Sequence, residues 1–248
     1  MTKVQGRTAA APTRSLAYGK AQIGDAQVVR LLPPLCPTTS FPAEVLLEVM
    51  EWAKVDTAVL LQGPIDGDAN EYAASAVRRW SDRFIGAGFL DPCAAQAGDR
   101  FRHITEELGL RILKFEFTES LGFPGPYPDF SLDSAMMEWM WAEAEEQGIL
   151  VTLDLCPMDS KSYQTEVVGN VLDAMSVPGQ GIEDYPYRIA CQYIRRAVEM
   201  VGPEKLLWGA DVPGLVIIAT YPQLLHFVTR HCDFLSRDAL DKMLGHNA

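Results

Sequence analysis

The sequence predicts an α/β fold built on a parallel sheet. Short apolar stretches rich in β-branched residues alternate with helical stretches, roughly every 25 to 40 residues. Strands that alternate with helices pair in parallel, as in a doubly wound sheet or a barrel. Acidic residues stand at the ends of several predicted strands, which is where β/α folds place their chemistry.

The predicted elements follow one another along the chain. Residues 41–55 are expected to form a helix, with Ser40 as its N-cap and Pro42 tolerated in its first turn. The further predicted helices span residues 71–80, 99–108 and 132–147. The predicted strands span residues 28–32, 55–61, 84–89, 111–117 and 149–155, and a last strand begins at Leu206.

Two segments interrupt the alternation. Residues 117–131 are rich in Gly and Pro and follow a strand end, so they either cover a site or form a surface connection. Residues 156–186 contain an expected helix over residues 163–175 and no convincing apolar strand. The strand count therefore falls short of the eight that a closed TIM barrel needs.

Length, composition and charge narrow the class of protein. With 248 residues, of which 48% are apolar, the chain can bury the core of one domain. The net charge of −12 argues against nucleic acid as a partner, because a phosphate backbone requires a basic surface. No apolar run approaches the ~20 residues that span a bilayer. The five cysteines form no C-x-x-C pair, so we expect reduced thiols and a cytoplasmic location.

The N-terminal segment has a different composition. It contains no acidic residue before position 21, and its basic residues are Lys3, Arg7, Arg14 and Lys20. A disordered tail and an organelle-targeting segment both explain this composition, which lacks the apolar core of a secretory signal. We expect residues 1–24 to form a flexible tail, followed by a single domain over residues 25–248.

Alternation along the strands predicts a polar row on one face of the sheet. In residues 111–117, Leu113, Phe115 and Phe117 are expected to face the helices. The row on the opposite face is expected to contain Gln62, Lys114, Glu116, Asp154 and Asp211. A lysine among carboxylates stays protonated and lowers their pKa values, and a divalent ion would do the same and also activate water. An internal ion-pair network without any catalysis explains the same residues.

One carboxylate, that of Asp211, lies at the end of the last predicted strand. Residues 206–214, LLWGADVPG, follow a helix that ends at Gly202 and Pro203. An Asp that closes an apolar strand is costly to bury without a partner, so Asp211 is a candidate functional residue. Capping of the next helix, or an ion pair with an Arg, would also explain it.

This region resembles the last part of the amidohydrolase-related family, the metal-dependent hydrolases and decarboxylases typified by aminocarboxymuconate semialdehyde decarboxylase. The matching segments are GPEKLLWGADVP (202–213), TYP (220–222) and LGHNA (244–248), with further similar segments at 40–64, 72–92, 110–117 and 148–157. In that family the Asp of the WGxDxP motif follows the final barrel strand and is a metal ligand or general base. The resemblance implies a TIM-type (β/α) barrel, here incomplete or distorted, and one of these roles for Asp211.

The other metal ligands of the family have no match. Its usual His-x-His and His-Leu-Gly motifs are absent, and the four histidines of this chain are His103, His226, His231 and His246. A further strand-end His of many members is Asp154 here. The resemblance implies Zn²⁺, whereas a metal held only by Glu116, Asp154 and Asp211 would be Mg²⁺ or Mn²⁺, because hard ions prefer oxygen ligands.

Together these features predict a metal-dependent hydrolase or non-oxidative decarboxylase acting on a small, anionic organic acid. The expected catalytic residues are Asp211 and Lys114, with Gln62 and Trp208 binding substrate and Asp211, Asp154 and Glu116 binding metal. The alternative is a non-catalytic scaffold or binding protein that has lost its metal site. Neither nucleic acid nor a membrane is an expected partner, and a barrel short of strands exposes edges that a second copy of the chain can cover in a homo-oligomer.

Overall fold

The computed structural model describes residues 13–23, 27–63, 67–117, 123, 127, 132–133, 135–154 and 184–248. The chain divides into two compact units. The first, the sheet unit, comprises Met1–Arg14, Ala21–Val29 and Asp56–Thr165; the second, the helical unit, comprises Ser15–Lys20, Arg30–Val55 and Glu166–Ala248. The helix expected over residues 163–175 lies outside the described residues, as do most of the two predicted interruptions and residues 1–12 of the expected tail.

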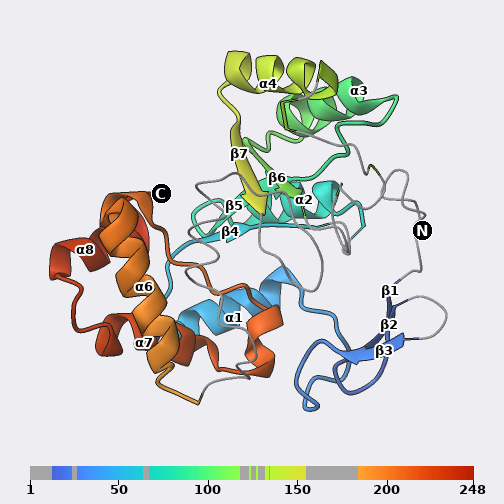
Figure 1. Ribbon diagram of the computed structural model, residues 1–248. Helices are drawn as coiled ribbons and strands as arrows, with labels where there is room; N and C mark the ends of the chain where they lie inside the picture. Colours follow the sequence, from blue (N-terminus) through green and yellow to red (C-terminus); the bar gives the residue numbers. More distant parts are fainter. Residues whose placement is uncertain are drawn as a thin grey trace. The chain divides into compact units, whose positions relative to one another are not determined.

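The sheet unit is built on four parallel strands in the order β4-β5-β6-β7, which is also their order along the chain (Figure 1). The strands are β4 Ala58–Leu60, β5 Phe84–Gly88, β6 Ile112–Glu116 and β7 Leu150–Asp154. The connections contain α2 Asn70–Arg79, α3 Ala97–Arg102 with a π-helical turn over His103–Glu107, and α4 Ala135–Gln147. These consecutive strand–helix units are the repeat of a (β/α) barrel.

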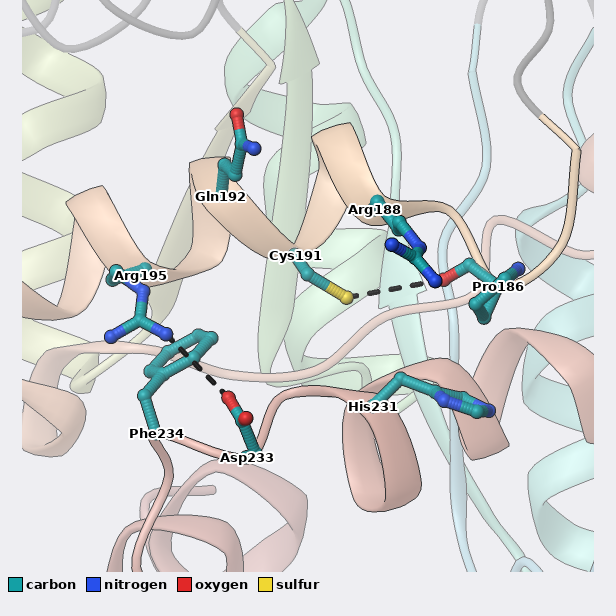
Figure 2. Close-up of a pocket in the computed structure, with 8 residues that line it drawn as sticks. All are labelled: Pro186, Arg188, Cys191, Gln192, Arg195, His231, Asp233 and Phe234. Carbon is teal, nitrogen blue, oxygen red and sulfur yellow. Dashed lines mark hydrogen bonds and ion pairs between the residues drawn. The ribbon is translucent and has the colours of Figure 1, made fainter.

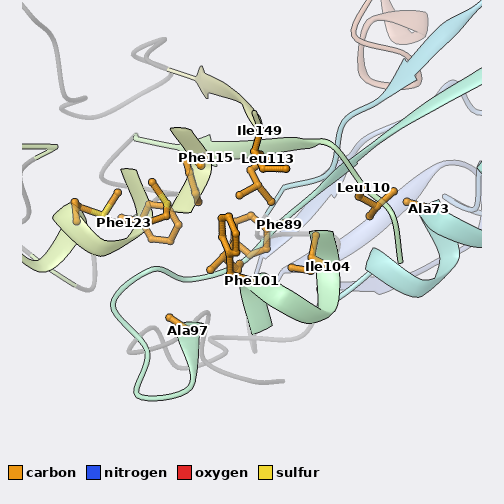
Figure 3. Packing of buried hydrophobic residues seen from close by; sticks show 14 of the residues in the cluster. Ala73, Phe89, Ala97, Phe101, Ile104, Leu110, Leu113, Phe115, Phe123 and Ile149 are labelled. Carbon is orange, nitrogen blue, oxygen red and sulfur yellow. The ribbon is translucent and has the colours of Figure 1, made fainter. Parts of the chain in front are cut away.

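One face of β6 forms the core of the sheet unit with the helices. Leu113, Phe115 and Phe117 are fully buried, which confirms the alternation predicted for this strand. They belong to a cluster that also contains Phe101 and Ile104 from the α3 segment. Figure 3 shows Leu113, Phe115 and Phe101 from this cluster close together. Each such aromatic or aliphatic side chain contributes about 2 kcal/mol when it is fully buried.

Two glycines in β5 allow neighbouring side chains to pack closely against the strand. A Cβ on Gly86 would lie 2.6 Å from Cδ2 of Leu110, and a Cβ on Gly88 would lie 2.4 Å from Cγ2 of Ile104. Carbon atoms do not pack at such distances. The side chains that cover this strand therefore occupy the space that any larger residue would need.

The helical unit contains α1 Ala43–Ala53, α6 Arg188–Val201, α7 Tyr221–His231 and α8 Arg237–Asp241. A π-helical turn, Lys242–His246, follows α8. The side chains of Cys191, Val228 and Cys232 are buried in its core cluster. Helix α7 begins with a capping box in which Thr220 and Gln223 satisfy each other's backbone N–H groups. None of the described helices is long and apolar enough to cross a membrane.

Helix α1 begins later than predicted. Its N-cap is Pro42, and no side chain caps it. The prediction of Ser40 as N-cap is therefore wrong, since that residue lies outside the helix. Pro42 has an extended ψ of 165°, which suits a proline at the entry to a helix because its φ is fixed and it needs no N–H partner.

A separate three-stranded sheet has the order β1-β2-β3. Its strands are β1 Thr13–Ser15, β2 Lys20–Ile23 and β3 Gln27–Arg30. The strand predicted over residues 28–32 thus forms, but it pairs in this small sheet and not in the parallel one. The expected N-terminal tail contains regular strands in its described part.

The strand predicted to begin at Leu206 is wrong. Residues 206–211 belong to no helix or strand. The backbone N–H of Trp208 donates to the carbonyl of Met243 at 2.9 Å, and the side-chain amide of Asn247 donates to the carbonyls of Pro203 and Leu206 at 2.8 Å each. The C-terminal helical turn therefore supplies the hydrogen bonds that a neighbouring strand would have supplied.

Candidate functional site

Three charged side chains gather at β6 and β7. The register places Lys114 opposite Thr152 and Glu116 opposite Asp154. Directly paired residues of adjacent strands point to the same face of a sheet, so the polar row predicted for these two strands is formed. Glu116 and Asp154 are the last residues of their strands, so the cluster lies toward the C-terminal edge of the sheet.

Lys114 forms ion pairs with both carboxylates. Its Nζ lies 3.1 Å from Oδ2 of Asp154 and 3.7 Å from Oε2 of Glu116. The side chains of Lys114 and Glu116 are only 16% and 8% exposed, and charges so far from water require partners. The cluster is thus a partly buried ammonium ion held between two carboxylates.

Gln62 joins the end of β4 to α2 and β5. Its Nε2 donates to Oδ1 of Asn70 at 3.0 Å and to the carbonyl of Ala87 at 2.8 Å, while its Oε1 accepts from the N–H of Ala69 at 3.2 Å. Both of its amide hydrogens are therefore used within the protein. Asn70 continues the network by bonding both backbone groups of Phe89 at 2.8 Å. The predicted substrate-binding role of Gln62 stays a prediction.

Asp91 is a buried carboxylate that the predicted site did not include. It follows β5, is 4% exposed, and accepts hydrogen bonds from the N–H of Cys93 at 2.7 Å and the hydroxyl of Tyr127 at 2.8 Å. Burial raises the pKa of Asp91, although both hydrogen bonds lower it in part. Burial and the nearby Asp91 raise the pKa of the Cys93 thiol to about 12. The position of Asp91 directly after an apolar strand is the sequence signal that could have identified this residue.

The two predicted site residues of the helical unit differ in their surroundings. Trp208 packs against the core cluster of that unit, and its Nε1 donates to the carbonyl of Leu224 at 3.2 Å. Asp211 is exposed and has a φ of 40°, a conformation that is uncommon outside glycine. Its carboxylate has no hydrogen bond or ion pair in the part of the chain that the structure describes. Capping and arginine pairing, the two structural explanations for Asp211, are therefore not realised there.

The cluster around Lys114 does not fit a divalent ion. Within the described ranges, no group of three or more His, Cys, Asp or Glu side chains is arranged to hold a metal. One oxygen of Glu116 and one of Asp154 already form ion pairs with the Lys114 ammonium. A divalent ion about 4 Å from that ammonium would be repelled by roughly 8 kcal/mol at a typical effective dielectric constant. In this cluster the carboxylates of Glu116 and Asp154 therefore have the Lys114 ammonium as a counter-ion, in the place of a metal ion.

The helical unit has a pocket of about 320 Å³ between α6 and the segment that follows α7 (Figure 2). One ion pair lies within its lining, between Arg195 and Asp233. Arg195 lies 3.5 Å from Oδ1 of Asp233 and 4.2 Å from the ring centroid of Phe234, and a ring nitrogen of His231 lies 2.8 Å from the hydroxyl of Tyr185. None of the predicted site residues lines this pocket. The lining residues are Pro186, Arg188, Cys191, Gln192, Arg195, His231, Asp233 and Phe234.

Comparison with known proteins supports the fold. No family model and no curated protein matches the chain. A probable 2-pyrone-4,6-dicarboxylic acid hydrolase from Acinetobacter baumannii is similar in structure, with a TM-score of 0.61, 14% identity and 96% of each chain covered. The 5-carboxyvanillate decarboxylase from Sphingomonas paucimobilis has a TM-score of 0.55 at 16% identity, over 83% of this chain and 84% of that one.

An uncharacterized TIM-barrel protein from Bordetella bronchiseptica is also similar, with a TM-score of 0.53 and 17% identity over 82% of this chain and 80% of its own. At such identities the likeness shows the fold alone. Together with the parallel β/α units of the sheet unit, it confirms the prediction of a TIM-type (β/α) barrel, incomplete in its described strands.

Proposed function

We propose that this protein is a hydrolase or non-oxidative decarboxylase that acts on a small organic acid, within one barrel domain over residues 25–248. The observation that carries the proposal is the cluster of Lys114, Glu116 and Asp154 toward the strand ends of a barrel fold, where barrel enzymes place their catalytic groups. Two proteins of similar fold, named as a dicarboxylic acid hydrolase and a carboxyvanillate decarboxylase, support this class of substrate and reaction.

Lys114 is proposed to stabilise negative charge on the substrate. Both hydrolysis and decarboxylation increase negative charge at the reacting centre, and a positioned cation with little access to water stabilises it strongly. Ion pairs with Glu116 and Asp154 hold the ammonium in place. The resemblance implies a divalent ion that would activate water, but no step is assigned to it, because the residues of this cluster do not fit one.

Asp211 is proposed as the general base. Its carboxylate is exposed and unpaired within the described residues, so it can accept a proton without first breaking an ion pair. Its positive φ agrees with the unusual backbone conformations that gather at functional sites. Gln62 and Trp208 are proposed to contribute to substrate binding. Their hydrogen bonds to Ala87 in β5 and to Leu224 in α7 would hold the nearby ends of the strand and the helix in position.

Assays of the purified protein against a panel of aromatic carboxylic acids and unsaturated lactones test this function. We expect CO₂ release or acid release with at least one of them, and a loss of about 100-fold in kcat/KM for Asp211→Asn. Lys242→Gln is the matched surface control, because Lys242 forms an ion pair with the exposed Asp238. A folded wild-type protein that turns over none of the panel would instead favour the scaffold alternative.

A further inference from the structure

We infer that the Lys114 ammonium takes the place of the divalent ion, so that the cluster works with a fixed cation of the protein and excludes metal. The catalytic part of this inference rests on the proposed function; the exclusion of metal does not. It concerns the side chains of Lys114, Glu116 and Asp154 and their positions on β6 and β7.

The backbone fixes the position of the ammonium. Lys114 is the central residue of β6, and this strand is paired along its length with β7, from Ile112 opposite Leu150 to Glu116 opposite Asp154. The flanking residues of Lys114 in the strand, Leu113 and Phe115, are fully buried on the other face. The lysine therefore lies on the face opposite the helices, where the two carboxylates also lie.

The two carboxylates would otherwise be suitable ligands for a hard cation. They come from directly paired residues of adjacent strands, and carboxylate oxygens are the donors that Mg²⁺ and Mn²⁺ prefer. An ammonium ion 3.1 Å from Asp154 and 3.7 Å from Glu116 satisfies the same oxygens with a single charge. Removal of this charge with little change in side-chain length should therefore strengthen metal binding at these carboxylates.

Binding of Mn²⁺ alone to the full-length protein tests the exclusion of metal. We expect no saturable binding to the wild type by calorimetry up to about 1 mM, the weak end of protein cation sites. Lys114→Gln should bind one Mn²⁺ about 100-fold more tightly, since the repulsion has been removed, and Lys114→Gln with Asp154→Asn should lose that binding. Lys242→Gln is the matched control and should bind as the wild type does.

Stoichiometric Mn²⁺ binding to the wild type would overturn the inference, and so would a Lys114→Gln protein that is folded by circular dichroism and binds no better than the wild type. If Lys114→Gln does not fold, Lys114→Met and the wild-type titration give the same decision. Any activity found for the wild type should be unchanged after dialysis against a chelator. Absence of activity would contradict only the proposed function, because Mn²⁺ binding is measured without substrate.

Discussion

The ammonium of Lys114 lies 3.1 Å from the carboxylate of Asp154 on the neighbouring parallel strand. The pair depends on strand register, because Glu116 and not Lys114 stands directly opposite Asp154. Lys114 thus reaches diagonally across the sheet, and it also lies 3.7 Å from Glu116 on its own strand. One side chain holds two strand ends together.

Replacement of Lys114 should destabilise the protein more than replacement of one carboxylate. Lys114→Met removes the ammonium that pairs with the buried Glu116 and the partly exposed Asp154, and we expect a loss of about 3 kcal/mol in the free energy of unfolding. Asp154 is 35% exposed, so Asp154→Asn should cost only about 1 kcal/mol. Urea unfolding followed by tryptophan fluorescence measures both. Equal losses for the two variants would contradict this order.

Gly88→Ala should destabilise the sheet unit. The added methyl would lie 2.4 Å from Cγ2 of Ile104 and 3.2 Å from Cδ2 of Leu113, and overpacking of this kind costs about 1 to 3 kcal/mol. The matched control is Gly98→Ala in α3, where the nearest atom lies 3.9 Å away; there we expect a gain of about 0.5 kcal/mol from helix propensity. Thermal unfolding of both variants distinguishes packing from a general effect of alanine.

Asn70→Ala should remove the link between the ends of β4 and β5. Asn70 is fully buried and bonds the N–H and the carbonyl of Phe89 as well as the side chain of Gln62. Buried backbone groups left without partners should cost about 3 kcal/mol in unfolding free energy. A double-mutant cycle with Gln62→Ala should give a coupling energy of about 1 kcal/mol. Additive losses would mean that the two side chains act independently.

The contacts of His103 with two glutamates should make the free energy of unfolding depend on pH. Hydrogen bonds to Glu107 and then Glu71, at 2.8 and 2.9 Å, raise the pKa of His103 above its ordinary value of 6.5. A raised folded-state pKa gives stability that is fully present below pH 6.5 and is lost as the pH rises through the folded-state value. The urea midpoint of the wild type relative to His103→Gln should therefore fall over that range. A difference between the two proteins that is constant with pH would contradict this.

The parallel core was predictable from local pattern, whereas the segment at Leu206 was not. Alternation in β6 separates Phe115 from Lys114 without knowledge of any neighbour, because the period of a strand fixes which side chains share a face. An apolar run alone does not specify its hydrogen-bond partner. At Trp208 the partner is the carbonyl of Met243, and Leu207 beside it is 60% exposed, so the run forms no strand.

The same limit applies to the candidate site. Lys114, Glu116 and Asp154 were found because strand pairing brings alternate residues together. The structural role of Gln62 in linking strand ends could not be predicted, because its hydrogen-bond partners Asn70 and Ala87 come from a helix and a second strand. Asp91 could have been found from its position directly after an apolar strand, but its hydrogen bond with Tyr127, 36 residues further along the chain, could not have been predicted.

The ion cluster also constrains how the chain can misalign while it folds. If β6 shifted by one residue against its neighbours, Lys114 and Glu116 would turn toward the hydrophobic core that contains Phe101 and Ile104. Phe115 would then turn away from that core. A slipped sheet would then bury two unpaired charges at once. The charged row therefore favours the observed strand register over a register shifted by one residue, whether or not these residues take part in a reaction.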